Sequence, residues 1–330
     1  MTSSNRVVFF NGEFVPESEA RISIYDSALM FGDMVFEMTR SFKGKQFKLR
    51  EHLERLYCSI RMVHIPLEMT IDEMEAAVLE TIRVNHEALA PDDEYRVMVD
   101  VSRGLLGIYE NTVAVRKGPN VIIAVFPLRW TVRGMGRLFE HGINAVVPSQ
   151  RAIPADLLDP KIKNRSRLHY LMANVEVSQV KGEDNWALLL DPDGYVAEGT
   201  GDNFFIVKDK QIITPEGRNI LRGISRDYVL EELAPKLGLP VYERNIGLYD
   251  VVNADEAFMT GTPFSMLPVC TINGSRIGRG TPGEITTALL NQWSLDVSVD
   301  IPGQIKAWDA TAGAATSSAP TPYSFRRKAV

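Results

Sequence analysis

The stretch DPKIKNRSRLHYLMANVEV (residues 159–177) places Lys163 at the end of a loop or strand, directly before a helix expected over about 166–179. A lysine in such a place is usually a solvated charge. A lysine that forms a Schiff base must instead be buried enough to lower its pKa, and it must face a carbonyl cofactor. Position alone does not separate Lys163 from Lys161, to which the same reasoning applies.

A second informative stretch is GYVAEGTGDNFFIVKDKQIITPEGRNILRGISRDYVLEEL (residues 194–233). Glu198 ends a predicted strand, and Gly199 and Gly201 allow a ligand to approach closely. A carboxylate in this place either binds a ring nitrogen of a cofactor or lies in water. Further on, residues 223–225 open a predicted helix, whose free N–H groups suit a phosphate but equally suit an ordinary N-cap.

The remaining pattern predicts mixed α and β structure. Residues 6–50 are expected to be antiparallel β structure, because Asn11-Gly12 and Lys43-Gly44 are turn signals between apolar stretches. Helices are also expected over 51–63, about 71–89 and about 225–238, and strands over 95–103, 120–126, 142–148, 203–207 and 211–213. Strands and helices do not alternate strictly, which favours the α+β class.

The chain has 330 residues, which predicts about two domains. The expected division is a small N-terminal α/β domain (1–126), an interdomain linker (127–136), a large domain (137–306) and a flexible tail (307–330). The linker PLRWTVRGMG is basic and contains glycine, and the tail is rich in Ala, Ser, Thr and Pro.

Composition argues against several classes of function. The 36 Lys and Arg against 42 Asp and Glu give a net charge of −6, which argues against binding nucleic acid. The two cysteines, Cys58 and Cys270, make no disulfide framework, and no Cys/His cluster has zinc spacing. We therefore expect no metal and a reducing, cytoplasmic setting. No secretory signal is evident, and apolar runs such as 121–126 are far too short to span a membrane.

One glycine-rich motif does not carry the function. Residues 278–283, GRGTPG, spell the dinucleotide-binding pattern G-x-G-x-x-G. That pattern requires the first βα turn of a nucleotide fold, whereas this copy lies near the end of the chain. We expect it to be a turn into the last helix, with Pro282 near the helix start.

Six ordered blocks, taken together, resemble a known family. The blocks are FGDMVFE (31–37), HLERL (52–56), IKNRSRLHYLMANVE (162–176), AEGTGDNFF (197–205), LRGISRD (221–227) and TGTPFSMLPV (260–269). Their order and spacing resemble the class IV, or fold type IV, pyridoxal-phosphate enzymes, and the resemblance covers about residues 7–295. It implies a two-domain α+β fold like that of D-amino acid aminotransferase, with a small α/β domain and a larger β-barrel-like domain with helices.

The resemblance also implies cofactor-binding roles. Lys163, favoured over Lys161 by its register to Glu176, would form the Schiff base with pyridoxal 5'-phosphate and move the proton. Glu198 would pair with the protonated ring nitrogen, because a fixed anion keeps the ring positive. Arg55 would hold the phosphate by charge-assisted hydrogen bonds. The remaining cofactor residues would be Leu221 against the ring, and Ile224, Ser225 and Thr262 around the phosphate.

Several positions depart from the family's usual residues. Leu168 stands where branched-chain aminotransferases usually have a tyrosine, five residues after the lysine. Leu29 replaces a frequent tyrosine before F-G-D. The Arg-x-His pair of the D-amino acid enzymes is absent after Ser102-Arg103-Gly104. The substrate carboxylate is therefore poorly accounted for, and Arg40 is either its binding residue or an ordinary surface arginine.

The substrate pocket implied by these departures is apolar. Its candidate residues, each of which could equally be core, are Phe36, Met98, Leu105, Ile108, Trp130 and Phe264. Such a pocket favours a hydrophobic side chain or amine. The family's members resemble one another in forming dimers, which implies a homodimer whose loop 104–110 reaches a neighbouring subunit's site.

The sequence as a whole therefore predicts an aminotransferase. It would move an amino group from a hydrophobic, branched-chain-like amino acid to a 2-keto acid by ping-pong chemistry. The alternatives are an (R)-amine or D-amino acid transaminase, an aminodeoxychorismate lyase, and a non-catalytic pyridoxal-phosphate-binding protein. The retained Lys163 and Glu198 count against the last of these.

Overall fold

The computed structural model describes residues 6–111 and 116–311. Contacts within the chain divide it into two compact units. Unit 1 comprises residues 1–128 and 162–167, and unit 2 comprises residues 129–161 and 168–330. Each unit is described by itself.

Unit 1 is built on an antiparallel sheet. Its strands, in the spatial order β2-β1-β6-β5-β3-β4, are β1 (Val7–Phe10), β2 (Glu13–Pro16), β3 (Met34–Phe42), β4 (Lys45–Gln46), β5 (Tyr95–Ser102) and β6 (Asn120–Pro127). The turns of both hairpins use left-handed backbone at Asn11-Gly12 and Lys43-Gly44, as the sequence predicts.

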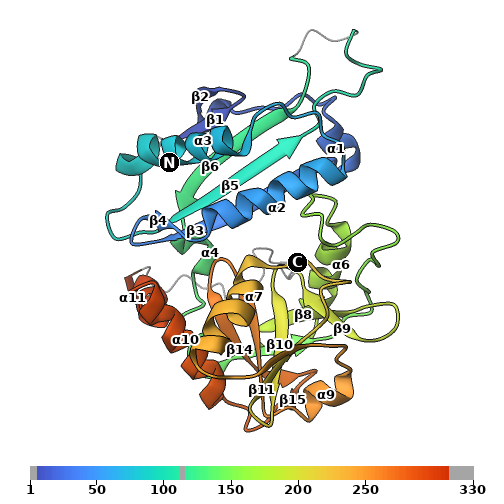
Figure 1. The fold of residues 1–330 in the computed structure, drawn as a ribbon, viewed down its shortest axis with the longest axis vertical. Helices are drawn as coiled ribbons and strands as arrows, with labels where there is room; N and C mark the ends of the chain where they lie inside the picture. The colour runs from blue at the N-terminus through green and yellow to red at the C-terminus, as the bar shows by residue number, and fades with distance from the viewer. Residues whose placement is uncertain (1–5, 112–115, 312–330) are drawn as a thin grey trace, which may run out of the picture. The chain divides into compact units, whose positions relative to one another are not determined.

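Two helices cover one face of this sheet (Figure 1). Alternate side chains of β5, at Val97, Val99 and Val101, pack against apolar residues of α2 and α3 such as Leu53 and Val78. Thr70 caps α3 in a capping box with Glu73, which fixes where that helix begins. The helices of unit 1 are η1 (Glu17–Glu19), α1 (Ser27–Phe31), α2 (Leu49–Met62), α3 (Ile71–Asn85) and η2 (His86–Ala88).

A short segment from much later in the chain extends the sheet of unit 1. Residues 162–167 lie along the outer edge of β3, where Asn164 forms an antiparallel bridge with Val35. The backbone N–H of Phe36 donates to the carbonyl of Lys163 (2.9 Å), and that of Arg165 donates to the carbonyl of Met34 (2.8 Å). Since side chains alternate across a strand, Lys163 and Arg165 share the sheet face of Phe36.

Unit 2 contains a sheet that closes on itself. Its strands are β7 (Ile143–Val146), β8 (Asn185–Leu190), β9 (Val196–Gly199), β10 (Asn203–Lys208), β11 (Gln211–Thr214), β12 (Val241–Glu243), β13 (Glu256–Gly261), β14 (Ser265–Ile272) and β15 (Ser275–Arg276). The spatial order is β12-β11-β10-β13-β14-β7-β8-β9, with β15 on β14. A further pairing of β9 with β10, between Glu198 and Asn203, closes the barrel.

Helices accompany this barrel. They are α4 (Arg129–Val132), α5 (Leu138–His141), α6 (Leu168–Val177), α7 (Ile224–Tyr228), the π-helical η3 (Val229–Leu233), α8 (Ala234–Lys236), α9 (Leu248–Val252), α10 (Glu284–Asp296) and α11 (Ile301–Thr311). The motif at 278–283 is a turn that ends at Gly283, the N-cap of α10, as expected. In the described residues, no helix is both long enough and apolar enough to cross a membrane.

The predicted two-domain α+β fold with a barrel-like second part is confirmed. The chain passes from unit 1 to unit 2 between Leu128 and Arg129, inside the proposed linker, where α4 follows directly. Residues 162–167, expected in the large domain, group with unit 1.

The proposed flexible tail begins too early. Residues 307–311 belong to α11, because Ile305 and Trp308 are buried and anchor that helix. Residues 312–330 lie outside the described residues.

Candidate active site

Lys163 is held at the edge of β3 by backbone contacts on both sides. Its carbonyl accepts from Phe36, and its N–H donates to Oγ of Ser59 on α2 (3.2 Å). Its Nζ lies 4.9 Å from the centre of the Phe36 ring. The lysine is thus fixed beside an aromatic side chain, which suits a reactive amine better than a mobile surface charge does.

Lys161, the competing lysine, is placed differently. It belongs to unit 2, and its Nζ forms an ion pair with Asp159 (2.8 Å). Of the two lysines, Lys163 is the one whose amine lies beside the Phe36 ring.

Arg165 covers the same phenylalanine. Its guanidinium lies 3.7 Å from the centre of the Phe36 ring, and it pairs with Asp100 of β5 (2.8 Å). Asp100 is the register partner of Phe36, so the ion pair crosses over that ring. This contact fixes the segment that follows Lys163.

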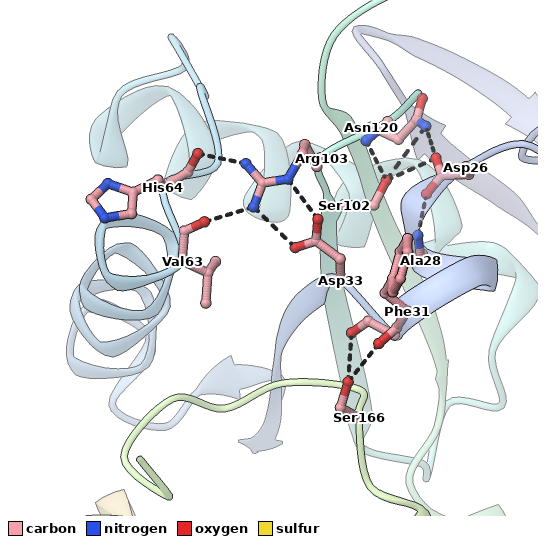
Figure 2. A network of polar contacts seen from close by, with 12 residues as sticks. Asp26, Ala28, Phe31, Asp33, Val63, His64, Ser102, Arg103, Asn120 and Ser166 are labelled. Atoms are coloured by element: carbon pink, nitrogen blue, oxygen red, sulfur yellow. Dashed lines mark hydrogen bonds and ion pairs between the residues drawn. The ribbon is translucent and has the colours of Figure 1, made fainter. Parts of the chain in front are cut away.

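The F-G-D motif anchors the same segment from the other end (Figure 2). Oγ of Ser166 donates to the carbonyls of Phe31 (2.9 Å) and Gly32 (3.3 Å). Gly32 has a left-handed backbone (φ +68°), and a Cβ there would lie 2.5 Å from Oγ of Ser166. The glycine of the motif is therefore required both by the turn and by the close approach of the lysine segment.

Arg103 locks the F-G-D loop to the sheet (Figure 2). Its Nε donates to Asp33 (2.6 Å), and its Nη atoms donate to the carbonyls of His64 (2.7 Å) and Val63 (2.6 Å) at the end of α2. The S-R-G sequence at the end of β5 therefore has a structural role within unit 1, because its arginine joins the F-G-D loop to the end of α2.

The side chain of Arg55 is held in place by a buried carboxylate. Glu37 of β3 is fully buried and receives Nε (2.6 Å) and Nη2 (2.9 Å) of Arg55 in a bidentate pair. Nδ1 of His52, one helical turn before Arg55, lies 2.8 Å from the same carboxylate. The side chain of Arg55 is 12% exposed, so its guanidinium is held in one orientation but remains accessible.

Opposing effects act on the titration of this cluster. Burial alone would raise the pKa of Glu37, but the charge of Arg55 and the hydrogen bonds of His52 and Arg55 hold that pKa well below its usual range. Burial lowers the pKa of His52, although Glu37 opposes the effect. Glu37 is therefore ionised and His52 neutral at pH 7, with Nδ1–H donating to the carboxylate.

Glu198 is a buried carboxylate of unit 2 that is held in place by hydrogen bonds, as Glu37 is in unit 1. It is 5% exposed and accepts from the hydroxyl of Tyr170 (2.7 Å), Nδ2 of Asn203 (3.1 Å) and the backbone N–H of Leu221 (3.0 Å). Hydrogen-bond donors stabilise an ionised carboxylate. The pairing of β9 with β10 that closes the barrel places this anion at a rigid point of the fold.

Asn203 links Glu198 to the residues expected around a phosphate. Its Nδ2 also donates to the carbonyl of Leu221 (2.9 Å), and a Cβ at Gly223 would lie 2.0 Å from its Oδ1. Gly223 is the N-cap of α7, which begins with Ile224 and Ser225 and packs against β13. The expected helix start is thus beside the barrel strand that carries Asn203.

Hydroxyl groups with free hydrogen-bonding capacity lie at the β13–β14 turn. Thr262 is half-buried in this turn, between strands that end at Gly261 and begin at Ser265. The hydroxyls of Thr260 and Ser265 are buried and have no hydrogen-bond partner within 6–111 and 116–311. Thr260 is the register partner of Asn203. Glu198, Leu221, Ile224, Ser225 and Thr262 therefore gather around one end of the barrel.

The candidate substrate residues have different surroundings. In unit 1, Phe36 is buried and Met98 is half-buried on the same sheet face. Arg40 is 1% exposed, so the alternative of an ordinary surface arginine is wrong. In unit 2, Phe264 is buried in an edge contact with Trp186, whereas Trp130 is 57% exposed.

Sequence reasoning assigned no role to the residues that hold Arg55 and Glu198. Glu37 was detectable as a charge inside an otherwise apolar strand, and His52 as the residue one helical turn before Arg55. Asn203 follows the Glu198 turn directly. Tyr170 had no local signal, because its hydroxyl reaches Glu198 across 28 residues of chain.

Comparison with known proteins identifies the family. The family model for amino-transferase class IV matches residues 34–272. The chain belongs to the class IV aminotransferases. This aminotransferase is 38% identical over 283 residues to a putative branched-chain-amino-acid aminotransferase of Methanocaldococcus jannaschii, covering 86% of this chain and 93% of that protein.

Solved structures agree with this assignment. The branched-chain aminotransferase of Escherichia coli superposes with a TM-score of 0.76 at 30% identity, covering 88% of this chain and 93% of that one. The branched-chain aminotransferase of Thermobaculum terrenum, solved in its PLP-form, gives a TM-score of 0.76 at 26% identity, covering 94% and 98%. Class IV aminotransferases use pyridoxal phosphate, so the cofactor of this enzyme is pyridoxal 5'-phosphate.

The residues present fit this cofactor. A fixed anion at Glu198 suits a protonated ring nitrogen, and the fixed guanidinium of Arg55 suits a phosphate. The buried hydroxyls of Thr260 and Ser265 retain hydrogen-bonding capacity for a further acceptor. Each unit taken by itself thus carries groups that suit part of this cofactor.

Proposed function

We propose that this class IV aminotransferase moves an amino group between a hydrophobic, branched-chain-like amino acid and a 2-keto acid. The observation that supports it most is a pair of half-buried methionines on the sheet face of Lys163. Met38 and Met98 lie on the same face of the sheet as Phe36, whose ring is near the lysine. Such a surface favours an aliphatic side chain.

We assign the chemistry to individual residues as follows. Pyridoxal phosphate, when bound, supplies an aldehyde that captures the amino group and a ring that takes up electrons. Lys163 would bind it covalently and would move the proton at the reacting carbon. Arg55 would hold the phosphate. Glu198 would keep a proton on the ring nitrogen. The remaining cofactor contacts are assigned to Leu221, Ile224, Ser225 and Thr262.

The proposed reaction has two halves. The donor leaves as a 2-keto acid after its amino group has passed to the enzyme, and a second 2-keto acid then takes up that group. Lys163 would act in both half-reactions. It would remove a proton from the donor in the first, and it would deliver a proton to the new amino acid in the second, which is the same step in reverse.

We also propose a homodimer in the cytoplasm. An exposed apolar surface on α1 supports the dimer, since Leu29 is 61%, Met30 44% and Phe31 66% exposed. Sedimentation of the holoenzyme is expected to give twice the mass of one chain, and the mass of one chain would contradict this. The free thiols of Cys58 and Cys270 are consistent with a reducing compartment.

A panel of amino donors tests the substrate class. Mixing the yellow holoenzyme with L-leucine, L-valine, D-alanine or (R)-1-phenylethylamine allows the donor half-reaction to be followed by loss of colour. We expect L-leucine and L-valine to react faster than D-alanine by at least about tenfold, because an apolar surface discriminates an aliphatic side chain from a methyl group by size.

Two outcomes of the panel would contradict the proposal. Faster reaction of D-alanine or of (R)-1-phenylethylamine would instead identify a D-amino acid or an (R)-amine transaminase. Steady turnover without a keto-acid acceptor would identify a lyase.

A further inference from the structure

The hydroxyl of Tyr170 reaches a carboxylate that lies far from it in the sequence. It donates to Oε1 of Glu198 (2.7 Å), across 28 residues of chain. Glu198 is 5% exposed, and Tyr170 is half-buried in the first turn of α6. Both residues belong to unit 2, so the contact is internal to one compact unit.

Packing of α6 holds the tyrosine in place. α6 lies beside β8 (Figure 1), and the buried Ala173 and Val177 of α6 pack in one cluster with apolar residues of that strand. The ring of Tyr170 packs against this cluster, and the centre of the His169 ring lies 4.1 Å from its own. Because the ring is held by this packing, the hydroxyl is directed at Glu198 before any ligand binds.

A second side chain of α6 contacts the turn that follows Glu198. Oγ1 of Thr200 donates to Oδ1 of Asn174 (3.1 Å), and Asn174 lies one helical turn after Tyr170. Two side chains on one face of α6 therefore reach this part of the barrel. Tyr170 contacts the carboxylate and Asn174 contacts the turn, so substitutions can separate the two effects.

The donors to Glu198 are divided between its two oxygens. Oε1 accepts from Tyr170, whereas Oε2 accepts from Nδ2 of Asn203 (3.1 Å) and from the backbone N–H of Leu221 (3.0 Å). Nδ2 of Asn203 also donates to the carbonyl of Leu221 (2.9 Å), which joins the two donors on the Oε2 side. Loss of the Tyr170 hydroxyl would leave that side intact. The tyrosine can therefore act on the charge of Glu198 while the other two donors keep the carboxylate in place.

We propose that Tyr170 is a positioning residue whose hydroxyl keeps Glu198 ionised and, through Glu198, keeps the proton on the ring nitrogen of the cofactor. The inference rests on the proposed function, because it takes Glu198 as the partner of that nitrogen. A hydrogen bond donated to a carboxylate is stronger than one donated to the neutral acid. Without the hydroxyl, the ionised form of Glu198 loses stabilisation, and the proton between the two groups shifts from the ring nitrogen toward the carboxylate.

Tyr170→Phe tests this inference, because it removes the hydroxyl and keeps the packed ring. The holoenzyme is prepared with pyridoxal 5'-phosphate labelled with nitrogen-15 in the ring, since the NMR resonance of a pyridine nitrogen changes position strongly when it takes up a proton. We expect the wild-type resonance at the protonated position near neutral pH. In Tyr170→Phe it should move toward the unprotonated position, and in Glu198→Gln it should move further.

The rate of the donor half-reaction gives a second readout. We expect Tyr170→Phe to lower this rate by about tenfold, the size of one hydrogen bond to a charged group. The double variant Tyr170→Phe/Glu198→Gln should react within about threefold of Glu198→Gln alone, because no charge is left for the hydroxyl to stabilise. A tyrosine with a purely structural role would lower the rate by the same factor in both backgrounds.

Thr200→Val is the matched control. It removes the hydroxyl that donates to Asn174 and nearly preserves the shape of the side chain. The nitrogen resonance should stay at the protonated position, and the rate should stay within about threefold of wild type, since a hydrogen bond between neutral groups contributes little. A shift of the resonance equal to that of Tyr170→Phe would show that the hold of α6 on the turn matters, and the role of the hydroxyl would have to be given up.

The inference is wrong if Tyr170→Phe keeps the wild-type resonance, if its effect on the rate adds fully to that of Glu198→Gln, or if the wild-type ring nitrogen is unprotonated. If Tyr170→Phe does not fold, two substitutions of similar size decide in its place. Tyr170→Gln keeps a donor and should hold the resonance nearer to the protonated position than Tyr170→Met does, and equal shifts would contradict the inference.

Loss of colour with L-leucine tests the proposed function separately. An enzyme that reacts with no amino acid would sink that function, while the nitrogen resonances of the wild type and of Tyr170→Phe would still decide the role of the tyrosine.

Discussion

Replacement of Lys163 by alanine is expected to abolish turnover. The substitution would remove both functions that we propose for Lys163, the covalent link to the cofactor and the transfer of the proton. We therefore expect a loss of at least about 10,000-fold in kcat, since either contribution alone reaches several powers of ten. Steady-state assays with the best donor of the panel and a 2-keto acid measure the effect.

Lys161→Ala is the matched control. It lies two residues away in sequence, but its amine pairs with Asp159. This variant should keep its kcat within about threefold, as expected for a surface ion pair of small energy. Comparable losses in both variants would point to a general disturbance of the segment and not to the chemistry of one amine.

A chemical experiment identifies the lysine independently of rates. Borohydride reduction of the holoenzyme fixes a lysine-bound cofactor, and peptide mass spectrometry then locates it. We expect the added mass on the peptide containing Lys163. Modification of Lys161 instead would overturn the assignment, even if both variants lost activity.

Local patterns predicted most of the secondary structure because the signals themselves are local. Asn11-Gly12, Lys43-Gly44 and Thr70 occupy the turn and cap positions that their chemistry favours. Trp308 shows where composition misled: the Ala- and Thr-rich stretch around it predicted a tail. The burial of Ile305 and Trp308 instead extends α11 into that stretch.

The surroundings of Lys163 could not be predicted from the residues next to it in the sequence. A lysine before a helix has no local feature that marks it as reactive. Its environment comes from pairing with β3, more than 100 residues earlier in the chain, and no periodicity reports that pairing. Family resemblance supplied what the local pattern could not, because it reflects the whole fold at once.

Arg40 and Arg96 also show that local sequence patterns do not predict the surroundings of a side chain. The sequence predicts strands through Arg40 and Arg96, but a period of two does not say which face is covered. An arginine on a half-apolar strand is usually exposed, whereas both of these are buried. The register of β3 and β5 shows that the side chains of Arg40 and Arg96 share a face of the sheet. Their contacts show that they reach different neighbours, because Arg40 donates to the carbonyl of Ser41 and Arg96 lies against the sulfur of Met38.

Replacement of Glu198 by glutamine is expected to lower kcat by about 100-fold or more, the usual size for loss of a preorganised electrostatic group. Glutamine has nearly the same shape but no charge, so it cannot keep a proton on the ring nitrogen. Its amide oxygen can still accept from Asn203 and Leu221, which share one oxygen of Glu198, while its NH2 group faces the hydroxyl of Tyr170; the substitution therefore removes mainly the charge. Steady-state assays at saturating cofactor measure the effect.

Cofactor affinity separates this electrostatic role from a binding role. Arg55 and the residues near the start of α7 are assigned to the phosphate, so Glu198→Gln should retain the cofactor after gel filtration. The absorption spectrum of the bound cofactor should change, because its ring nitrogen loses a counterion. Loss of the cofactor with an unchanged spectrum in the remaining holoenzyme would contradict an electrostatic role.

Asp202 provides a demanding comparison because it lies on the same turn as Glu198. Its backbone carbonyl accepts from Gly199 (3.0 Å), and a Cβ at Gly199 would lie 2.1 Å from its carboxylate. Asp202→Asn therefore removes a charge from the same turn without touching the three donors that orient Glu198. If the charge must be at Glu198, Asp202→Asn should keep a normal spectrum and most of its kcat. Equal losses in the two variants would mean that the summed negative charge of the turn matters, and the specific pairing of Glu198 with the ring nitrogen would have to be abandoned.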